Sequence, residues 1–290
     1  MTDPVADLLA LLEPERLEVN LFRGRGDGGE TPTRVFGGLV IAQALVAAYR
    51  TVEDRACHSL HAYFIRPGDP AIPIVYEVDR ARDGGSFTTR RVIAVQHGRQ
   101  IFNLAASFHV EEPGWSHQHD APAAPEPETL PSRAELRERD AERAPERWRA
   151  DFLRPRPVEI READPQDLFA PTPKPDANAL WFRVPGVGAA TPELHQCLLA
   201  YASDMNLLSS GARPHAVSPF TGAMFASLDH AMWFHAPLRF DEWHLYAMDS
   251  PFTGGARSFN RGLIYDRAGR LVASTAQEGL MRPIDRSRKG

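Results

Sequence analysis

The sequence Phe36-Gly37-Gly38 leads directly into LVIAQALVAAY at residues 39–49, and this stretch decides the fold. These residues are apolar or small almost all the way round a helix, and a helix of that kind is buried. Strand-like segments follow at 59–65, 74–82, 87–96 and 101–110. Their alternation of apolar and polar residues is typical of half-buried strands. We therefore predict a buried helix wrapped by an antiparallel meander.

The same order of elements returns in the second half of the chain. A helix-like run at 191–208 precedes strand-like segments at 224–234, 243–250, 258–265 and 271–281. Three landmarks recur at an offset of 170 or 171 residues: Tyr63-Phe64 with Trp233-Phe234, Gly84-Gly85 with Gly254-Gly255, and His97-Gly98-Arg99 with Ala268-Gly269-Arg270. Repetition at a fixed spacing indicates a duplicated unit. We expect an α+β fold of two tandem repeats, each with a long central helix wrapped by an antiparallel sheet.

The residues between the two halves, 113–176, have a different composition. They hold twelve of the 25 prolines in the chain. Within them, residues 132–149 interleave glutamate with arginine, a pattern typical of a solvated helix. Proline-rich stretches act as semi-rigid spacers between folded units. We predict an N-terminal repeat at 1–112, a connecting segment with a charged helix at 113–176, and a C-terminal repeat at 177–290.

Length and composition exclude several classes of protein. The chain has 290 residues, of which 43% are hydrophobic, and a formal net charge of −5. This apolar fraction and modest charge exclude a chain that is disordered as a whole. A protein that binds nucleic acid ordinarily carries a basic excess, whereas here 38 Asp and Glu outnumber 33 Lys and Arg. We expect no nucleic-acid partner.

Cysteine and lysine usage adds two observations. Cys57 and Cys197 are the only cysteines, too few for a disulfide framework and compatible with a reducing cytosol. Lys174 and Lys289 are the only lysines, so nearly all positive charge is arginine. Two explanations of this bias stay open: the codon usage of the genome, and contacts with phosphate or carboxylate groups, which guanidinium favours.

The N-terminus and the apolar runs predict no membrane span. Asp3 as N-cap and Pro4 at the first helical position favour a short amphipathic helix. Acidic residues also stand where a signal peptide needs basic ones. The longest near-apolar run, 39–49, falls short of the roughly 20 residues that cross a bilayer. We expect a cytoplasmic protein.

Several motifs with well-defined chemistry are missing from the sequence. Neither lysine follows the glycine spacing of a phosphate-binding loop, and neither G-x-S-x-G nor H-E-x-x-H occurs. Cys57-His58 and His195-Gln196-Cys197 lack the paired spacing of a zinc site. We expect neither a bound metal nor an organic cofactor.

Polar residues stand at positions of the second half where the pattern predicts burial. Asp204 interrupts the core-like run YASDMNL at 201–207, and a buried unpaired carboxylate is costly. Asp204 is therefore either a helix-end cap or a functional group. Ser227 lies in a polar cluster among aromatics, and Gln277 lies in a polar insertion in the last strand. The matching residues of the first half, AASF at 105–108, lack that insertion, so the second half is the better candidate for the site.

Seven motifs spread over nearly the whole chain point to one family. They are LFRG at 21–24, VFGG at 35–38, HSLHAYFIRPGD at 58–69, RDG at 82–84, YASD at 201–204, DHAMWFH at 229–235 and QEG at 277–279. With these motifs the sequence resembles the type II acyl-CoA thioesterases, and F-x-R-P-G-D and D-H-x-M-W-F-H are the specific ones. The resemblance implies a double hotdog fold, with one continuous antiparallel sheet around two central helices. It also implies hydrolysis of fatty acyl-CoA, the substrate partner, to free fatty acid and CoA.

The resemblance assigns the family's catalytic Asp, Ser/Thr and Gln to Asp204, Ser227 and Gln277 in the C-terminal repeat. The residue types suit the reaction, because a carboxylate can act as general base while a hydroxyl and an amide hold the attacking water in line. A backbone N–H at a helix N-terminus or a glycine turn is expected to stabilise the oxyanion. Weaker candidates for substrate binding are His58, Arg66, Arg90, Arg91, Asp229 and His230, the arginines because guanidinium suits CoA phosphates.

Two other functions remain open on the same fold. An enoyl-CoA hydratase or dehydratase would use the Asp229-His230 pair as acid and base, and it would leave the CoA thiol bound to the acyl group. A non-catalytic protein would bind acyl-CoA without turnover. The resemblance further implies a homo-oligomer.

Overall fold

The computed structural model describes residues 3–26 and 33–284. Its first half contains α1 (Pro4–Leu11), β1 (Glu15–Glu18), β2 (Leu21–Gly24), α2 (Gly37–Tyr49), β3 (Ala56–Phe64), β4 (Ile74–Asp83), β5 (Phe87–Gln96) and β6 (Arg99–His109). Its second half contains β8 (Asn178–Arg183), α5 (Pro192–Ser203), α6 (Ser209–Ala212), the 3-10 turn η3 (Arg213–His215), β9 (Ala223–Ser227), β10 (Asp229–Phe234), β11 (His244–Gly254), β12 (Arg257–Asp266) and β13 (Leu271–Pro283). The strands β4 and β5 begin 170 residues before β11 and β12, which confirms the repeat.

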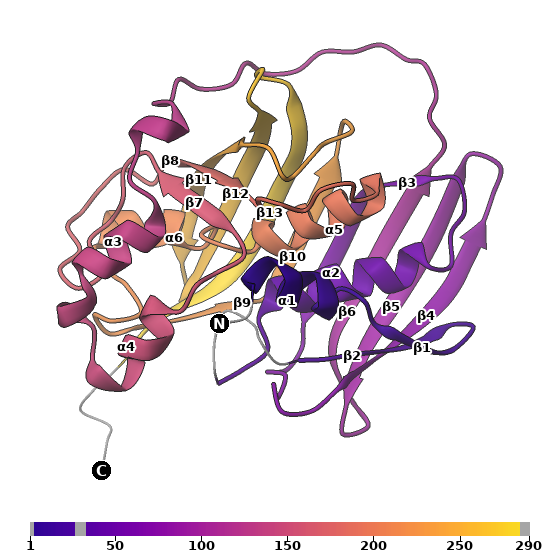
Figure 1. Ribbon diagram of the computed structural model, residues 1–290, viewed down its shortest axis with the longest axis horizontal. Coiled ribbons are helices and arrows are strands. Elements are labelled where there is room, and N and C mark those ends of the chain that lie inside the picture. The colour runs from indigo at the N-terminus through magenta and orange to yellow at the C-terminus, as the bar shows by residue number, and fades with distance from the viewer. Residues whose placement is uncertain (1–2, 27–32, 285–290) are drawn as a thin grey trace.

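The strands form one antiparallel sheet that runs through both halves. Its order is β1-β2-β4-β5-β6-β3-β10-β13-β12-β11-β8-β7, and β9 pairs with β13 beside this path. The two halves join where β3 pairs with β10, with Leu60 opposite Met232. Figure 1 shows α2 and α5 on one face of this sheet. The α+β architecture is therefore the double hotdog arrangement that the resemblance implies.

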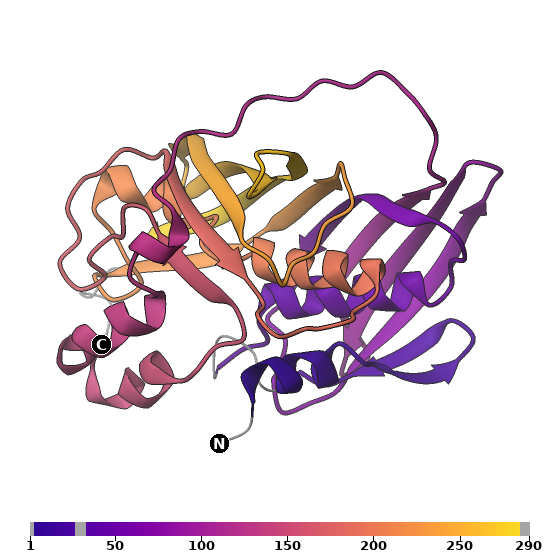
Figure 2. The ribbon, with the colours of Figure 1, turned by 45° about the horizontal axis from the view of Figure 1, so that its top comes forward.

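The two long helices α2 and α5 lie side by side and antiparallel (Figure 2). At one end, a Cβ placed on Gly38 would come 2.1 Å from the carbonyl oxygen of Tyr201. At the other end, the Tyr49 hydroxyl donates a hydrogen bond to Oε1 of Gln196. Only glycine permits the backbones to approach so closely at the start of α2. Nearly every residue of both helices is buried, as their composition predicts.

The short N-terminal helix is also confirmed. Asp3 caps α1, because its Oδ1 accepts a 3.0 Å hydrogen bond from the backbone N–H of Val5, and Pro4 occupies the first helical position. Within residues 3–26 and 33–284, no helix is long and apolar enough to cross a membrane.

The connecting segment folds against the second repeat, whereas its composition predicted one solvated helix. The charged stretch breaks into α3 (Arg133–Arg139), the 3-10 turn η2 (Ala141–Arg143) and α4 (Glu146–Leu153). Pro145 separates the last two, because proline lacks the N–H that would continue a helix. The segment also supplies the 3-10 turn η1 (Pro127–Thr129) and the edge strand β7 (Glu159–Glu162), which pairs with β8. The prediction of a single solvated helix was wrong for this reason.

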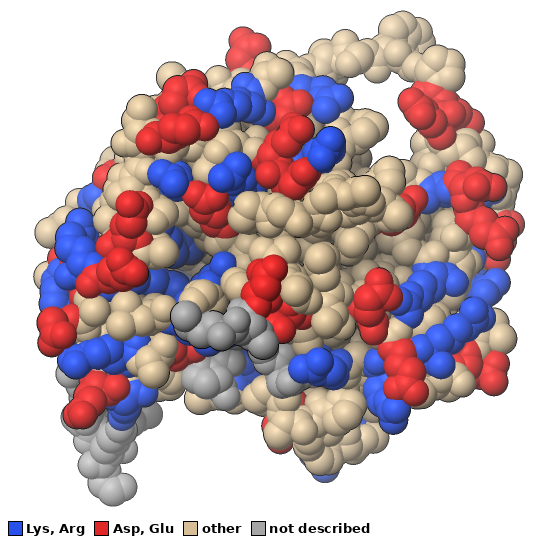
Figure 3. Space-filling view, in the orientation of Figure 1, with Lys and Arg blue, Asp and Glu red and all other residues tan. Residues whose placement is uncertain are grey.

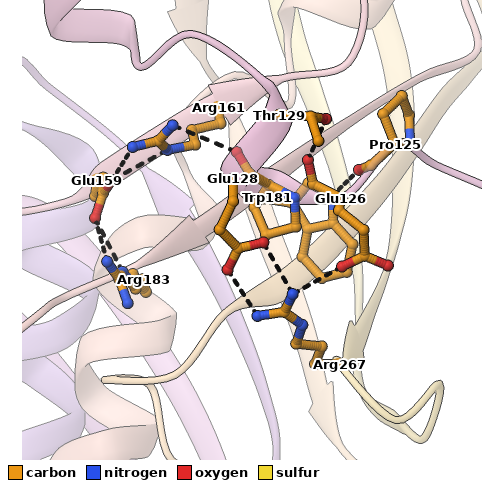
Figure 4. Close-up of polar contacts among 10 residues, drawn as sticks. Pro125, Glu126, Glu128, Thr129, Glu159, Arg161, Trp181, Arg183 and Arg267 are labelled. Atoms are coloured by element: carbon orange, nitrogen blue, oxygen red, sulfur yellow. Dashed lines mark hydrogen bonds and ion pairs between the residues drawn. The ribbon is translucent and has the colours of Figure 1, made fainter.

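Arginine–carboxylate pairs hold the connecting segment to the second repeat (Figure 4). Arg183 of β8 bonds both guanidinium edge atoms to Glu159 of β7, at 2.9 and 2.8 Å. Arg267, in the turn between β12 and β13, bonds Glu126 and Glu128 at 2.8 to 2.9 Å. Figure 3 shows the two signs of charge interspersed over this face. The arginine-rich composition thus has a structural use, since guanidinium pairs with carboxylates in a fixed geometry.

Candidate functional site

A cavity of about 790 Å³ lies where the two repeats and the connecting segment meet. Its wall is formed by the start of α2 and the 64–68 loop, by α3, α4 and the 162–168 loop, and by residues between 204 and 228. The volume is typical of small-molecule sites. Among the candidate residues, Asp204, Ser227 and Arg66 line it.

Asp204 follows directly on the last residue of α5, as its C-cap. A helix C-terminus presents carbonyl oxygens and the negative end of the helix dipole, so a carboxylate there cannot act as a cap for N–H groups. The side chain turns instead towards the sheet and towards the start of α2. Of the two interpretations that the sequence left open, the helix cap is therefore excluded.

Ser227 and Gln277 both donate hydrogen bonds to the same oxygen of Asp204. The Ser227 hydroxyl lies 3.1 Å from Oδ1, and the Gln277 Nε2 lies 2.7 Å from it. Ser227 ends β9, and Gln277 lies in the middle of β13, where both strands pair. Ser227 reaches the cavity, whereas Gln277 is wholly buried behind Asp204. The sheet thus brings together three residues that are far apart in the sequence.

The start of α2 lies against the other carboxylate oxygen. A Cβ placed on Gly37 would come 2.6 Å from Oδ2 of Asp204, so glycine is needed for this contact too. The backbone N–H of Gly38 also hydrogen-bonds the Asp204 carboxylate. The positive end of the α2 dipole therefore faces the carboxylate, an arrangement that favours negative charge.

Burial dominates the ionisation of Asp204. It raises the pKa of this carboxyl to about 6, while the hydrogen bonds from Gln277, Ser227 and Gly38 act to lower it. A carboxyl with a pKa near 6 is ionised at neutral pH and is still basic enough to accept a proton. The group is therefore suited to general-base work.

His230 is locked into the core behind the same cluster. The Ser203 hydroxyl donates its hydrogen to the carbonyl of Ala200 at 2.9 Å, so it accepts from His230 Nε2 at 3.0 Å. Burial lowers the pKa of His230 to about 4, and the neighbouring Gln277 side chain opposes the shift. The imidazole is therefore neutral at pH 7, with its hydrogen on Nε2. Among the described residues, neither His230 Nδ1 nor Gln277 Oε1 makes a hydrogen bond.

Asp229 and the other weaker candidates lie elsewhere. Asp229 accepts a 2.7 Å hydrogen bond from the backbone N–H of Glu278, and burial raises its pKa. His58 bonds Ser107 Oγ at 2.8 Å, and burial lowers the pKa of its ring. None of Asp229, His230 and His58 lines the cavity. The structure thus leaves them out of the space where a substrate would bind.

The three candidate arginines have different environments. Arg90 is wholly buried and bonds Thr51 through Nε at 2.8 Å, so it cannot meet a CoA phosphate, and that expectation was wrong. Its neighbour Arg91 is exposed on the opposite face of β5, because successive strand residues alternate, and that face lacks the helices. Arg66 is exposed at the cavity, with Nη1 2.7 Å from the carbonyl of Gln100.

Sequence reasoning missed the connecting segment's part in the cavity. Leu136 of α3, Phe152 of α4 and Leu168 line it. Their apolar character was visible, but only the tertiary fold places a predicted linker against Asp204. Arg34, also at the cavity, donates a 3.2 Å hydrogen bond to the carbonyl of Phe225.

The described ranges contain no group of three or more His, Cys, Asp or Glu placed to hold a metal ion. Cys57 and Cys197 are both buried free thiols, and burial raises the pKa of each.

Two family models match the chain. Residues 149–280 match the acyl-CoA thioesterase model, and residues 28–109 match the model of the acyl-CoA thioesterase N-terminal domain. The chain is 38% identical to acyl-CoA thioesterase 2 of Haemophilus influenzae over 97% of its length and 99% of that protein's. It is 40% identical to acyl-coenzyme A thioesterase 8 of Mus musculus, over 94% of this chain and 88% of the relative.

A solved structure agrees with these sequence relatives. The crystal structure of the acyl-CoA thioesterase II TesB2 from Mycobacterium marinum superposes with a TM-score of 0.78 at 43% sequence identity. The match covers 95% of this chain and 98% of the other. The similarity therefore extends over both repeats and over the segment between them.

Proposed function

The chain belongs to the type II acyl-CoA thioesterases, and we propose that it hydrolyses fatty acyl-CoA to free fatty acid and CoA by general-base activation of water at Asp204. It is an acyl-CoA thioesterase, a thioester hydrolase. One observation carries the proposed mechanism: Ser227 and Gln277 converge on one oxygen of Asp204 at the wall of the cavity.

In the proposed reaction, a water molecule gives a proton to Asp204 as its oxygen attacks the thioester carbonyl carbon. Oδ1 already accepts two hydrogen bonds, so we assign the base to Oδ2. Ser227 reaches the cavity and positions the water, and the buried Gln277 holds the carboxylate in place. The tetrahedral intermediate then collapses with cleavage of the C–S bond. The departing CoA thiolate takes up the proton held by Asp204.

The start of α2 supports the negative charge that develops on the carbonyl oxygen. Gly37 is the first residue of α2 and lines the cavity beside Asp204. We assign its backbone N–H as oxyanion donor, because helix-terminal N–H groups are fixed in orientation and lie at the positive end of the dipole. Thiolate is a good leaving group, so the reaction needs no strong acid.

The hydratase alternative receives no support from the position of its acid/base pair. His230 is buried, with its Nε2 engaged by Ser203, and Asp229 accepts a backbone hydrogen bond. An acid/base group must lie within hydrogen-bond reach of the proton it transfers. Neither residue lines the cavity.

We also propose a cytoplasmic homo-oligomer that serves lipid metabolism, with the two repeats at 1–112 and 177–290. Two buried reduced cysteines agree with a reducing compartment. Tyr63 and Ile93 are both exposed and both pair with Asn103, so they share the sheet face away from the helices. Exposed apolar rows of this kind mark association surfaces. Light scattering tests this, and a monomeric mass at working concentration contradicts it.

A thiol-release assay across a series of acyl-CoA chain lengths tests the mechanism. We expect Asp204→Asn to lower kcat by at least about a hundredfold, because general-base catalysis contributes roughly 10²–10⁴. Asp249→Asn is the matched control, since it makes the same change in an exposed pair with Arg261. Near wild-type turnover in Asp204→Asn would sink the mechanism. Saturable binding of acyl-CoA without release of thiol by the wild type would favour the non-catalytic alternative.

A further inference from the structure

The connecting segment supplies one whole side of the cavity. From α3 come Leu136 and Arg137, from α4 comes Phe152, and from the following loop comes Leu168. The opposite lining includes Leu208 from the second repeat. A segment that only joined the two repeats would have no reason to line the space next to Asp204.

This side is apolar and tightly packed. Phe152 is buried, and its ring centroid lies 5.6 Å from that of Phe169 and 6.1 Å from that of Phe220. The guanidinium of Arg137 lies 5.6 Å above the Phe152 ring, so its stem covers the aromatic group. Leu136 is half-buried at the cavity. Such a surface suits a hydrocarbon chain, which gains free energy from every methylene removed from water.

Ion pairs and a cap hold this side in place. Arg133 of α3 bonds Glu162 of β7 at 2.8 Å, and both side chains are about one-fifth exposed. Arg143 bonds Asp167 at 2.8 Å. Ser132 and Glu135 close α3 with a reciprocal capping box. The wall is therefore a fixed boundary, and a fixed boundary can measure length.

The side formed by the first repeat has a different character. Arg34 and Arg66 are both exposed there, on either side of the start of α2 in the sequence and in the cavity lining. Guanidinium groups suit the phosphates of CoA. With Asp204 between the two sides, the CoA moiety lies towards Arg66 and the acyl chain lies towards α3 and α4.

We propose that α3 and α4 form the acyl-length wall, with Leu136 and Phe152 as the residues that set the preferred chain length. The inference rests on the proposed hydrolysis of acyl-CoA and names the part of the chain that selects the substrate. In an apolar pocket, one methylene more or fewer changes kcat/KM about tenfold or more. A change in wall volume at Leu136 therefore moves the preference between neighbouring chain lengths.

The test measures kcat/KM for a saturated acyl-CoA series in four variants of the full chain. Leu136→Ala enlarges the space and Leu136→Trp fills it, at a position whose side chain is not in the core. Phe152→Ala removes the ring from the aromatic cluster. Leu153→Ala is the matched control, because Leu153 is the next residue of α4, is exposed and does not line the cavity. Free CoA is added as a competitive inhibitor to report on the other side.

Opposite shifts support the inference. We expect Leu136→Ala to raise the ratio of long-chain to short-chain kcat/KM about tenfold. Leu136→Trp lowers that ratio, Leu153→Ala leaves it unchanged, and inhibition by CoA stays the same in all of them. Equal changes at every chain length, or weakened inhibition by CoA in the Leu136 variants, overturn the inference while hydrolysis stands. A wild type that releases no thiol from any acyl-CoA overturns the proposed function and the inference with it.

Discussion

The amide Nε2 of Gln277 lies 2.7 Å from Oδ1 of Asp204, although 73 residues separate them in the chain. This hydrogen bond joins the last strand of the sheet to the end of a central helix. The donor is wholly buried, so its hydrogen-bonding capacity is directed at the carboxylate and not at solvent. Bonds to an ionised group of this kind are stronger than bonds between neutral groups. The carboxylate is therefore held rigidly where the cavity begins.

The raised pKa of Asp204 sets the pH dependence of the reaction. The carboxyl must be ionised to accept a proton, and burial raises its pKa to about 6. We expect kcat/KM to rise with pH through a midpoint near 6 and to level off above it. Initial rates of thiol release in buffers on both sides of this midpoint measure the profile. A flat profile across this range would exclude Asp204 as the base.

Ser227 gives a second test of the same carboxylate. Its 3.1 Å hydrogen bond to Oδ1 lowers the pKa of Asp204, so its removal raises that pKa further. We expect Ser227→Ala to lower kcat and to move the midpoint of the pH profile upwards. Ser227→Thr keeps the hydroxyl and restores the midpoint of the wild type. A loss of rate in Ser227→Ala with no movement of the midpoint would show that the hydroxyl acts only on the water.

The same shift has a cost in stability. The folded-state pKa of about 6 exceeds the ordinary value of 3.8, so the folded protein holds the proton more tightly. Stability therefore falls as pH rises through this window, by up to about 3 kcal/mol for this one group. We expect Asp204→Asn to unfold at a higher temperature than the wild type at pH 8, with the difference shrinking towards pH 4. Thermal melts at several pH values measure this, and a difference independent of pH contradicts it.

Gly38 controls the contact between the two central helices. A methyl group there would meet the Tyr201 carbonyl at 2.1 Å, so the backbones must separate. We expect Gly38→Ala to destabilise the fold by about 1–3 kcal/mol and to lower kcat, because Asp204 moves with the end of α5. Gly85→Ala is the control, since nothing lies within 4 Å of its added methyl. Urea unfolding measures both variants, and equal midpoints would show that the helices yield without cost.

The regular parts of the fold were accessible from the sequence because each has a local signal. Apolar periodicity predicted α2 and the four strands after it, and the repeat carried the same pattern into the second half. The short strands β1, β2 and β7 were not predicted. Exposed strands of about four residues have almost no alternation to detect, and β1 is exposed throughout.

The site was accessible only in part. Asp204 was conspicuous, because a carboxylate in an apolar run needs a reason. Its contact with the start of α2 was not predictable, because it depends on how two helices 150 residues apart pack together. Arg90 misled for the opposite reason: arginine is rarely buried, and here five hydrogen bonds compensate for its burial.

The antiparallel packing of α2 and α5 would create two equivalent sites if the halves were identical. Arg50 follows α2 where Asp204 follows α5, and it pairs with Glu13. Ala106 lies opposite Arg90 in the place that Gln277 takes opposite Asn260. One half has thus given up the chemical groups that the other half retains. Covalent fusion permits this, because a substitution in a duplicated gene alters one copy, whereas in a symmetric dimer it alters both. The stoichiometry that follows is one hydrolytic centre per polypeptide.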